Sequence, residues 1–261
     1  MDQSIITRLQ HEAATAGVGV GSDEYYAARF ARSPYRYHAW CILTLKTIIE
    51  DIPLKVSDPG VARLKLAWWQ DRDSRVKHPV FEIAGELGIA PDRLHRAVGD
   101  LSESMDHEFG ATPPCSDTER SQRLRDAYAN LYELIGNDVE LAVTLEETRS
   151  LLRLRDLLKA NLCRLPSDKL AQHGLAEDSF FNPREASACQ KFLNEELSAA
   201  AIQLNAALRH GAQNRGPIYC YAYLTEQRLN ETIAEGGRLL EQKVDLTALR
   251  KLWLAWRCRW I

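Results

Sequence analysis

Asp58-Pro59-Gly60-Val61-Ala62-Arg63-Leu64-Lys65-Leu66-Ala67-Trp68-Trp69 is the stretch of this sequence that decides the fold. Asp58 is a residue type that caps helix N-termini, and Pro59 follows at the first helical position, where its missing N–H costs nothing. Apolar side chains then recur at helical spacing, so that Val61, Leu64 and Trp68 share one face. The stretch predicts an amphipathic helix with a defined start.

The same helical pattern extends over the rest of the 261 residues, and strand alternation is almost absent. Ser116 to Glu119 has capping-box spacing and opens a helix that ends near Gly136, and the next helix runs to about Asn161. We expect about eight to ten helices in one all-α domain over residues 1–261, with residues 1–20 as a loosely ordered lead-in. Six apolar residues are expected to be buried: Leu64, Trp68, Leu131, Leu145, Leu152 and Leu197.

Composition excludes several classes of protein. Lys and Arg number 33 against 36 Asp and Glu, and this balance excludes a globally basic nucleic-acid binder. The six cysteines form no C-x-x-C pair and have no histidine at ligand spacing, which argues against a zinc site. The first residues lack the basic region and apolar core of a secretion signal, so a cytoplasmic location is expected.

Several segments, taken together and in this order, carry a resemblance to a known family. They are Tyr25 to Ala31, Lys46 to Leu54, Asp58 to Trp69, Leu154 to Ala160, Arg164-Leu165-Pro166, His173-Gly174-Leu175 and Arg250 to Trp256. The chain resembles the squalene/phytoene synthase family. The resemblance implies an all-α isoprenoid-synthase bundle around an apolar cavity, in which Mg²⁺ ions bridge two acidic helix faces to prenyl diphosphates.

The sequence departs from the family pattern on the first acidic face. Glu50 and Asp51 stand where its first acids would be, but the position one turn later is Leu54. Carboxylates four residues apart project from the same side of a helix and can share a cation, so losing one removes much of a metal site.

The second acidic face is degenerate in the same way. Asp156 follows Arg155, but Lys159 and Ala160 occupy the positions where further acids would be. A remnant metal site would therefore comprise Glu50, Asp51 and Asp156, and Mg²⁺ is expected only if the protein is active. If other acids replace the missing ones, the first candidates in the sequence are Asp138, Glu146 and Glu147.

Five cations are candidates for binding diphosphate oxygens, for which arginine geometry is well suited. They are Arg29, Arg36, Lys46, Arg155 and Arg164. Each has a plainer interpretation as a surface cation. Glu50 and Asp51 can likewise be a solvated helix end, and Asp156 can belong to a local ion-pair cluster with its neighbours.

We therefore expect a squalene/phytoene synthase-like protein of isoprenoid metabolism, a prenyltransferase whose activity is weak or lost, with a prenyl diphosphate or prenyl lipid as ligand. The alternative is a non-catalytic prenyl-lipid-binding protein or respiratory-complex assembly factor. The stretch from Arg155 to Pro166 is shorter than in catalytic members, and this resembles the branch with the mitochondrial complex I assembly factor. Whether the chain is an enzyme stays open.

The C-terminus allows two interpretations. Trp253, Trp256 and Trp260 fall on one helical stripe with Leu249, flanked by Arg250, Lys251, Arg257 and Arg259. Tryptophan beside cations suits a membrane interface and indicates peripheral membrane contact. The stripe can also close the bundle as part of its core.

Overall fold

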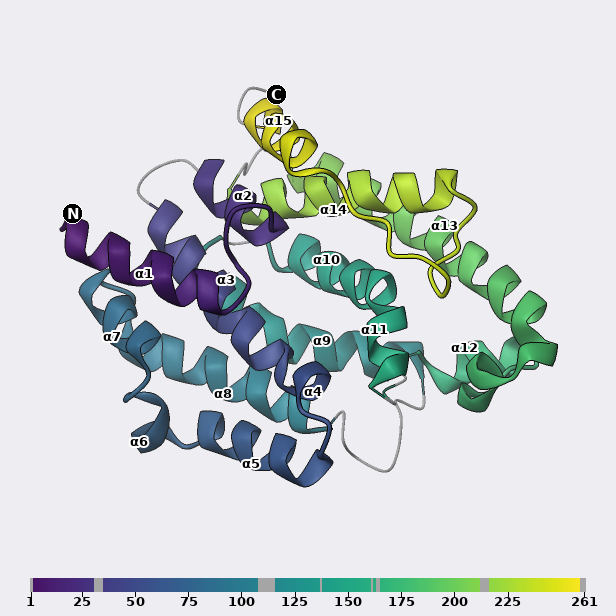
Figure 1. Ribbon diagram of the computed structural model, residues 1–261, viewed down its shortest axis with the longest axis horizontal. Coiled ribbons are helices and arrows are strands. Elements are labelled where there is room, and N and C mark those ends of the chain that lie inside the picture. Colours follow the sequence, from purple (N-terminus) through teal and green to yellow (C-terminus); the bar gives the residue numbers. More distant parts are fainter. Residues whose placement is uncertain are drawn as a thin grey trace.

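The computed structural model describes residues 2–30, 35–107, 116–136, 138–160, 162, 165–211 and 216–258, and these residues form an all-α structure without a strand (Figure 1). The helices are α1 (Gln3–Thr15), α2 (Asp23–Phe30), α3 (Arg36–Glu50), α4 (Ile52–Lys55), α5 (Pro59–Gln70), α6 (Arg72–Arg75), α7 (Pro79–Glu86), α8 (Pro91–His107), α9 (Asp117–Tyr132), α10 (Val139–Leu152), α11 (Leu154–Lys159), α12 (Ser167–Gln172), the 3-10 helices η1 (Glu177–Phe181) and η2 (Pro183–Glu185), α13 (Ala186–Gly211), α14 (Pro217–Ala234) and α15 (Ala248–Cys258). This is more than the eight to ten expected, because helices of four to six residues such as α4, α6 and α12 are too short to show periodicity.

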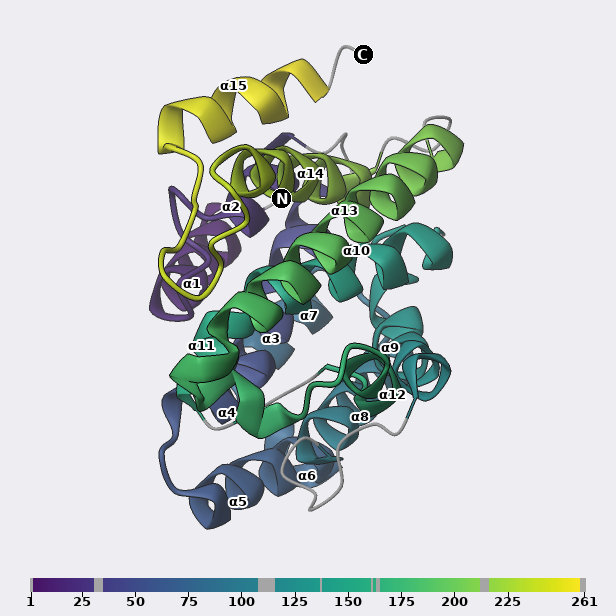
Figure 2. The same ribbon diagram turned by 90° about the vertical axis from the view of Figure 1, so that its right-hand side faces the viewer.

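Helix α10 lies near the centre of the bundle and packs on α9, α13 and α14. Helix α9 packs in turn on α8, and α8 on α5, while α2 packs on both α3 and α14. Both views place α15 at one end of the molecule and α5 at the opposite end (Figures 1 and 2). The central position of α10 brings its side chains against those of α3 and α2.

Two helix starts that the sequence predicts are confirmed. The Asp58 carboxylate accepts a hydrogen bond of 2.8 Å from the backbone N–H of Val61 and begins α5. The Ser116 hydroxyl accepts one of 3.1 Å from the N–H of Glu119 and begins α9. Each cap satisfies a donor that the helix itself leaves unpaired.

The predicted core is correct in part. Leu131, Leu145 and Leu197 are fully buried, and Leu152 is half-buried at the edge of a pocket. The prediction is wrong for Leu64, which is 73% exposed, and for Trp68, which is 37% exposed. Both faces of α5 are apolar, but α5 lies at the edge of the bundle. Only one of its faces, carrying Ala62, Leu66 and Trp69, is buried.

Two expectations about local structure are also wrong. The N-terminal segment is a regular helix, α1, with Leu9 and Ala13 buried, and it packs on α3 and α7 rather than forming a loose lead-in. The single helix expected up to Asn161 is divided into α10 and α11, with Arg153 at the junction. The break turns the chain at the point where Arg153 reaches toward the end of α3.

None of the helices in the described part of the chain combines the length and the apolar character needed to span a bilayer.

Candidate functional site

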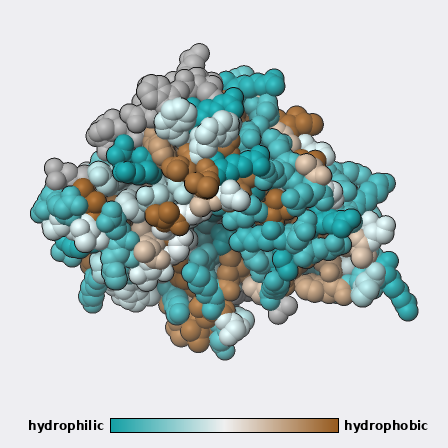
Figure 3. Space-filling view, turned by 45° about the horizontal axis from the view of Figure 1, so that its top comes forward, coloured by the Kyte–Doolittle hydropathy of each residue, from teal (hydrophilic) through white to brown (hydrophobic). Residues whose placement is uncertain are grey.

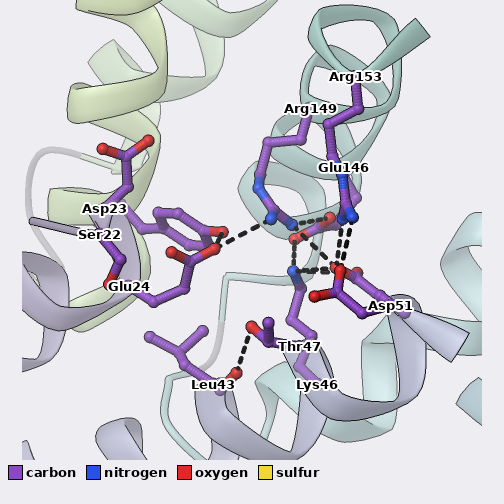
Figure 4. Close-up of polar contacts among 12 residues, drawn as sticks. Ser22, Asp23, Glu24, Leu43, Lys46, Thr47, Asp51, Glu146, Arg149 and Arg153 are labelled. Atoms are coloured by element: carbon purple, nitrogen blue, oxygen red, sulfur yellow. Dashed lines mark hydrogen bonds and ion pairs between the residues drawn. The ribbon is translucent and has the colours of Figure 1, made fainter. Parts of the chain in front are cut away.

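Six charged side chains meet inside the bundle and make up the buried ion network. They are Glu24 of α2, Lys46 and Glu50 of α3, Glu146 and Arg149 of α10, and Arg153 at the α10–α11 junction. Figure 4 labels all of them except Glu50. Three are acidic and three are basic, so the network is neutral as a whole. Lys46 is fully buried, and Glu50 and Glu146 are each 3% exposed.

The ion pairs of the network are short and shared. The Lys46 Nζ lies 3.0 Å from Glu50 and 3.2 Å from Glu146. The Arg149 guanidinium contacts Glu146 at 2.6 Å, Glu24 at 3.1 Å and Glu50 at 3.6 Å. Arg153 bridges Glu50 at 3.1 Å and Asp51 at 2.8 Å. Each cation therefore neutralises at least two carboxylates.

A tyrosine hydroxyl completes the coordination of every acid in the network. Tyr128 donates to Glu50 at 2.5 Å, Tyr132 donates to Glu146, and Tyr221 donates to Glu24. The Arg149 guanidinium also stacks on the Tyr221 ring, 4.8 Å from its centroid. Buried charges persist only when they are paired and fully hydrogen-bonded, and this set meets that condition.

The pairing changes the protonation equilibria of the network. Burial by itself would raise the pKa of Glu50, but Lys46, Arg149 and Arg153 outweigh it and hold that pKa well below its ordinary value. Burial also opposes ionisation of Glu24, yet Arg149 and Lys46 lower its pKa. The carboxylates raise the pKa of Arg149 further above its usual range despite its burial. At neutral pH the Glu24 and Glu50 side chains are therefore carboxylates and the Arg149 guanidinium is charged.

These residues do not fit a divalent metal. Lys46 and Glu50 lie one turn apart on α3, and Arg149 and Arg153 lie one turn apart at the end of α10 and contact Glu50. Three of these four side chains are basic, and only Glu50 is a carboxylate. Mg²⁺ needs carboxylate oxygens left free for it. Within the described ranges, no three His, Cys, Asp or Glu side chains converge in a way that could hold an ion.

A pocket of about 740 Å³ opens beside the buried ion network. It lies between the loop of residues 17–22 with the start of α2, the ends of α3 and α10, helix α11 and the loop that precedes α15. Seven basic and five acidic side chains line it, so its net charge is positive: Lys55, Arg149, Arg153, Lys159, Arg228, Lys243 and Lys251 against Asp23, Glu24, Asp51, Asp156 and Asp245. This polar pocket differs from the expected apolar cavity, because the tyrosines and ion pairs occupy the interior of the bundle.

The three residues expected to form a remnant metal site do not lie together in the structure. Asp51 and Asp156 both line the polar pocket, whereas Glu50 is enclosed in the buried ion network. Asp51 is bound by Arg153 and by Lys55 at 3.0 Å. Glu50 is therefore not the solvated helix end of the plainer interpretation. Of the replacement acids, Glu146 joins the network, Asp138 caps α10, and Glu147 accepts a hydrogen bond from Ser121.

None of the expected diphosphate-binding cations in the described part of the chain lines the polar pocket. Lys46 is enclosed between Glu50 and Glu146. Arg29 is exposed on α2, and Arg36 and Arg155 are half-buried elsewhere. Arg164 lies outside the described residues, as does Trp260 of the C-terminal stripe.

Sequence reasoning missed Arg149 and Arg153, two of the three cations in the buried ion network. Arg149 and Arg153 are spaced as i and i+4, which places them on one helix face, and Glu146 is one turn before Arg149. This spacing is the sequence signal from which a charged cluster on this helix could have been predicted. A second group was also missed: buried Asp23 binds Arg228 at 3.2 Å and Lys251 at 3.0 Å, and this fastens α15 to the start of α2.

Comparison with known proteins gives a structural match only. No family model and no curated protein matches the sequence. A solved structure of a dehydrosqualene synthase in complex with a ligand matches with a TM-score of 0.71 and 10% sequence identity. The match covers 98% of this chain and 97% of the synthase. At this identity the likeness establishes the architecture alone, and it does so over the full length: the chain has the all-α isoprenoid-synthase fold.

Proposed function

We propose that this protein binds an anionic isoprenoid, a prenyl diphosphate or prenyl lipid, without metal and without condensing it. The single observation that supports this is the buried ion network, in which the carboxylates of Glu50 and Glu146 are already paired with lysine and arginine, whereas a metal-dependent synthase needs free carboxylates. Ionisation of an allylic diphosphate requires that the departing diphosphate be neutralised. Cations that are already paired with buried acids do not supply that charge.

The polar pocket supplies binding without turnover. Lys159 and Lys243 line it, and neither has an ion pair with another described residue. Both lysines are exposed, and an exposed ammonium group can bind a phosphate as a point charge. Leu54, Leu152 and Val244 add apolar surface to the lining for the first isoprene units.

The test is calorimetric titration with farnesyl diphosphate, in Mg²⁺ and again in EDTA, followed by product analysis. We expect the same dissociation constant in both buffers and no condensed product, and we expect Lys159→Ala with Lys243→Ala to weaken binding by about tenfold or more. Lys191→Ala, an exposed lysine on α13, is the matched control and should change nothing. Turnover of about 1 per second that requires Mg²⁺ would refute the proposal.

Assembly of a membrane-bound respiratory complex is the second candidate function. It is favoured by apolar side chains left exposed on two helices, Val61 and Leu64 on α5 and Trp253 and Trp256 on α15. Exposed apolar stripes of this kind are typical of docking surfaces. The proposed location, in either case, is a membrane surface reached through α15.

A further inference from the structure

Helix α15 has two faces of different character. Its inner face, with Lys251, Leu254, Ala255 and Cys258, is buried against α14 and α2. The α15 outer face comprises Leu249, Leu252, Trp253, Trp256 and Arg257. Leu249 is 78% exposed and both tryptophans are about half exposed, which overturns the interpretation that they close the bundle.

The charged residues of α15 and of the residues that follow it are all basic. Residues 246–261 contain four Arg or Lys and no Asp or Glu. The Arg257 guanidinium lies 5.3 Å from the centroid of the Trp253 ring, so cation and aromatic ring are presented together. Arg250 is paired with Glu231 and Lys251 with Asp23 and Asp245, so Arg257 is the cation that the described part of the outer face presents beside its tryptophans. An amphipathic helix that presents tryptophan beside a cation is complementary to a bilayer of anionic lipids.

The inner face of the same helix forms part of the polar pocket. The Lys251 ammonium donates to the backbone carbonyl of Gly21 at 3.0 Å and lies 2.8 Å from Asp245. Lys243 and Val20, which is 79% exposed, also line this side of the pocket. Figure 3 looks onto the molecule from this end and shows apolar side chains on the face that is hollowed near its centre.

We propose that the α15 outer face docks on an anionic bilayer, and that the polar pocket takes its phosphate-bearing ligand from that bilayer as a lipid rather than from solution. This inference rests on the proposed function, because it names the source of the ligand. Docking places the exposed Lys243 near the headgroup layer, where a lipid phosphate can enter the pocket while its chain stays in the membrane.

Co-sedimentation tests the docking with vesicles of phosphatidylcholine alone and of phosphatidylcholine with phosphatidylglycerol. We expect binding only to the anionic vesicles and weakening as salt rises. Trp253→Ser with Trp256→Ser should reduce binding by about tenfold or more, with an unchanged melting temperature because the outer face holds little of the core. Val61→Ser with Leu64→Ser, on an equally exposed apolar face at the far end of the molecule, is the matched control and should bind like the wild type.

Loading is tested with a fluorescent polyprenyl phosphate placed in the same anionic vesicles. The wild type should withdraw or protect the probe, and Lys159→Ala with Lys243→Ala should still sediment with the vesicles but leave the probe unprotected. The tryptophan variant should still bind farnesyl diphosphate in solution, so failure of the docking claim is distinguishable from failure of the proposed function. Equal vesicle binding by the tryptophan variant, equal loss in the α5 control, or equal binding to neutral vesicles overturns the inference.

Discussion

Replacement of Arg149 by methionine is expected to lower the free energy of unfolding by about 3–5 kcal/mol, the usual cost of removing one partner from a buried ion pair. Arg149 is 7% exposed and contacts Glu24, Glu50 and Glu146. Methionine fills much of the volume, so the cost comes from carboxylates left in the interior without their counter-charge. Equilibrium unfolding in denaturant measures this change in the free energy of unfolding.

Arg125→Met is the matched control for this prediction. Arg125 pairs with Glu140 at 2.8 Å between α9 and α10, but both side chains are exposed. Its loss should cost less than about 1 kcal/mol. The double variant Arg149→Met with Glu146→Gln should recover part of the loss, because one of the stranded charges is removed. An effect of Arg149→Met no larger than that of Arg125→Met would show that the buried ion network contributes little to the free energy of unfolding.

Acid is expected to destabilise the protein steeply below about pH 4.5, the ordinary pKa of a glutamate side chain. The pKa values of Glu50 and Glu24 are lowered in the folded protein. Their contribution to stability is therefore complete above pH 4.5 and is lost as pH falls toward the folded-state pKa. Protonation of Glu50 removes one counter-charge from each of Lys46, Arg149 and Arg153.

Glu50→Gln isolates this effect, since glutamine mimics the protonated acid. The variant should be less stable than the wild type at neutral pH and should lose less stability on going from pH 7 to below pH 4.5. Glu82→Gln, which removes an exposed partner of Arg8, should follow the wild-type pH profile. Parallel pH profiles for Glu50→Gln and the wild type would contradict the assigned pKa shift.

The fold could be predicted from sequence because its signals are local. Asp58 and Ser116 mark helix starts, because each side chain caps the helix through a hydrogen bond to a backbone N–H three residues later. Leu131, Leu145 and Leu197 were correctly expected in the core because they lie on helices packed on several sides. Leu64 was expected in the core and is exposed, because periodicity identifies an apolar helix face but does not show whether a neighbouring helix covers it.

The site could be predicted only in part because its contacts are long-range. The sequence singled out Glu50 and Asp51 as part of a remnant metal site, but the residue that they contact in the structure, Arg153, is about a hundred residues away in the chain. Glu146 was considered as a replacement metal ligand, and its actual partners are Lys46 and Arg149. Spacing within one helix shows which side chains share a face, whereas the opposing helix decides whether they meet a metal or a cation.

Glu24, Glu50, Asp51 and Glu146 are each paired with protein cations, and Asp156 alone on these helix faces does not supply the carboxylates that a divalent ion needs. Electron paramagnetic resonance of Mn²⁺, titrated into the protein with and without farnesyl diphosphate, tests this claim most directly. We predict no protein-bound Mn²⁺ beyond the amount that the diphosphate holds in buffer. Saturable Mn²⁺ binding that disappears in Glu50→Gln, Asp51→Asn or Asp156→Asn would contradict the claim.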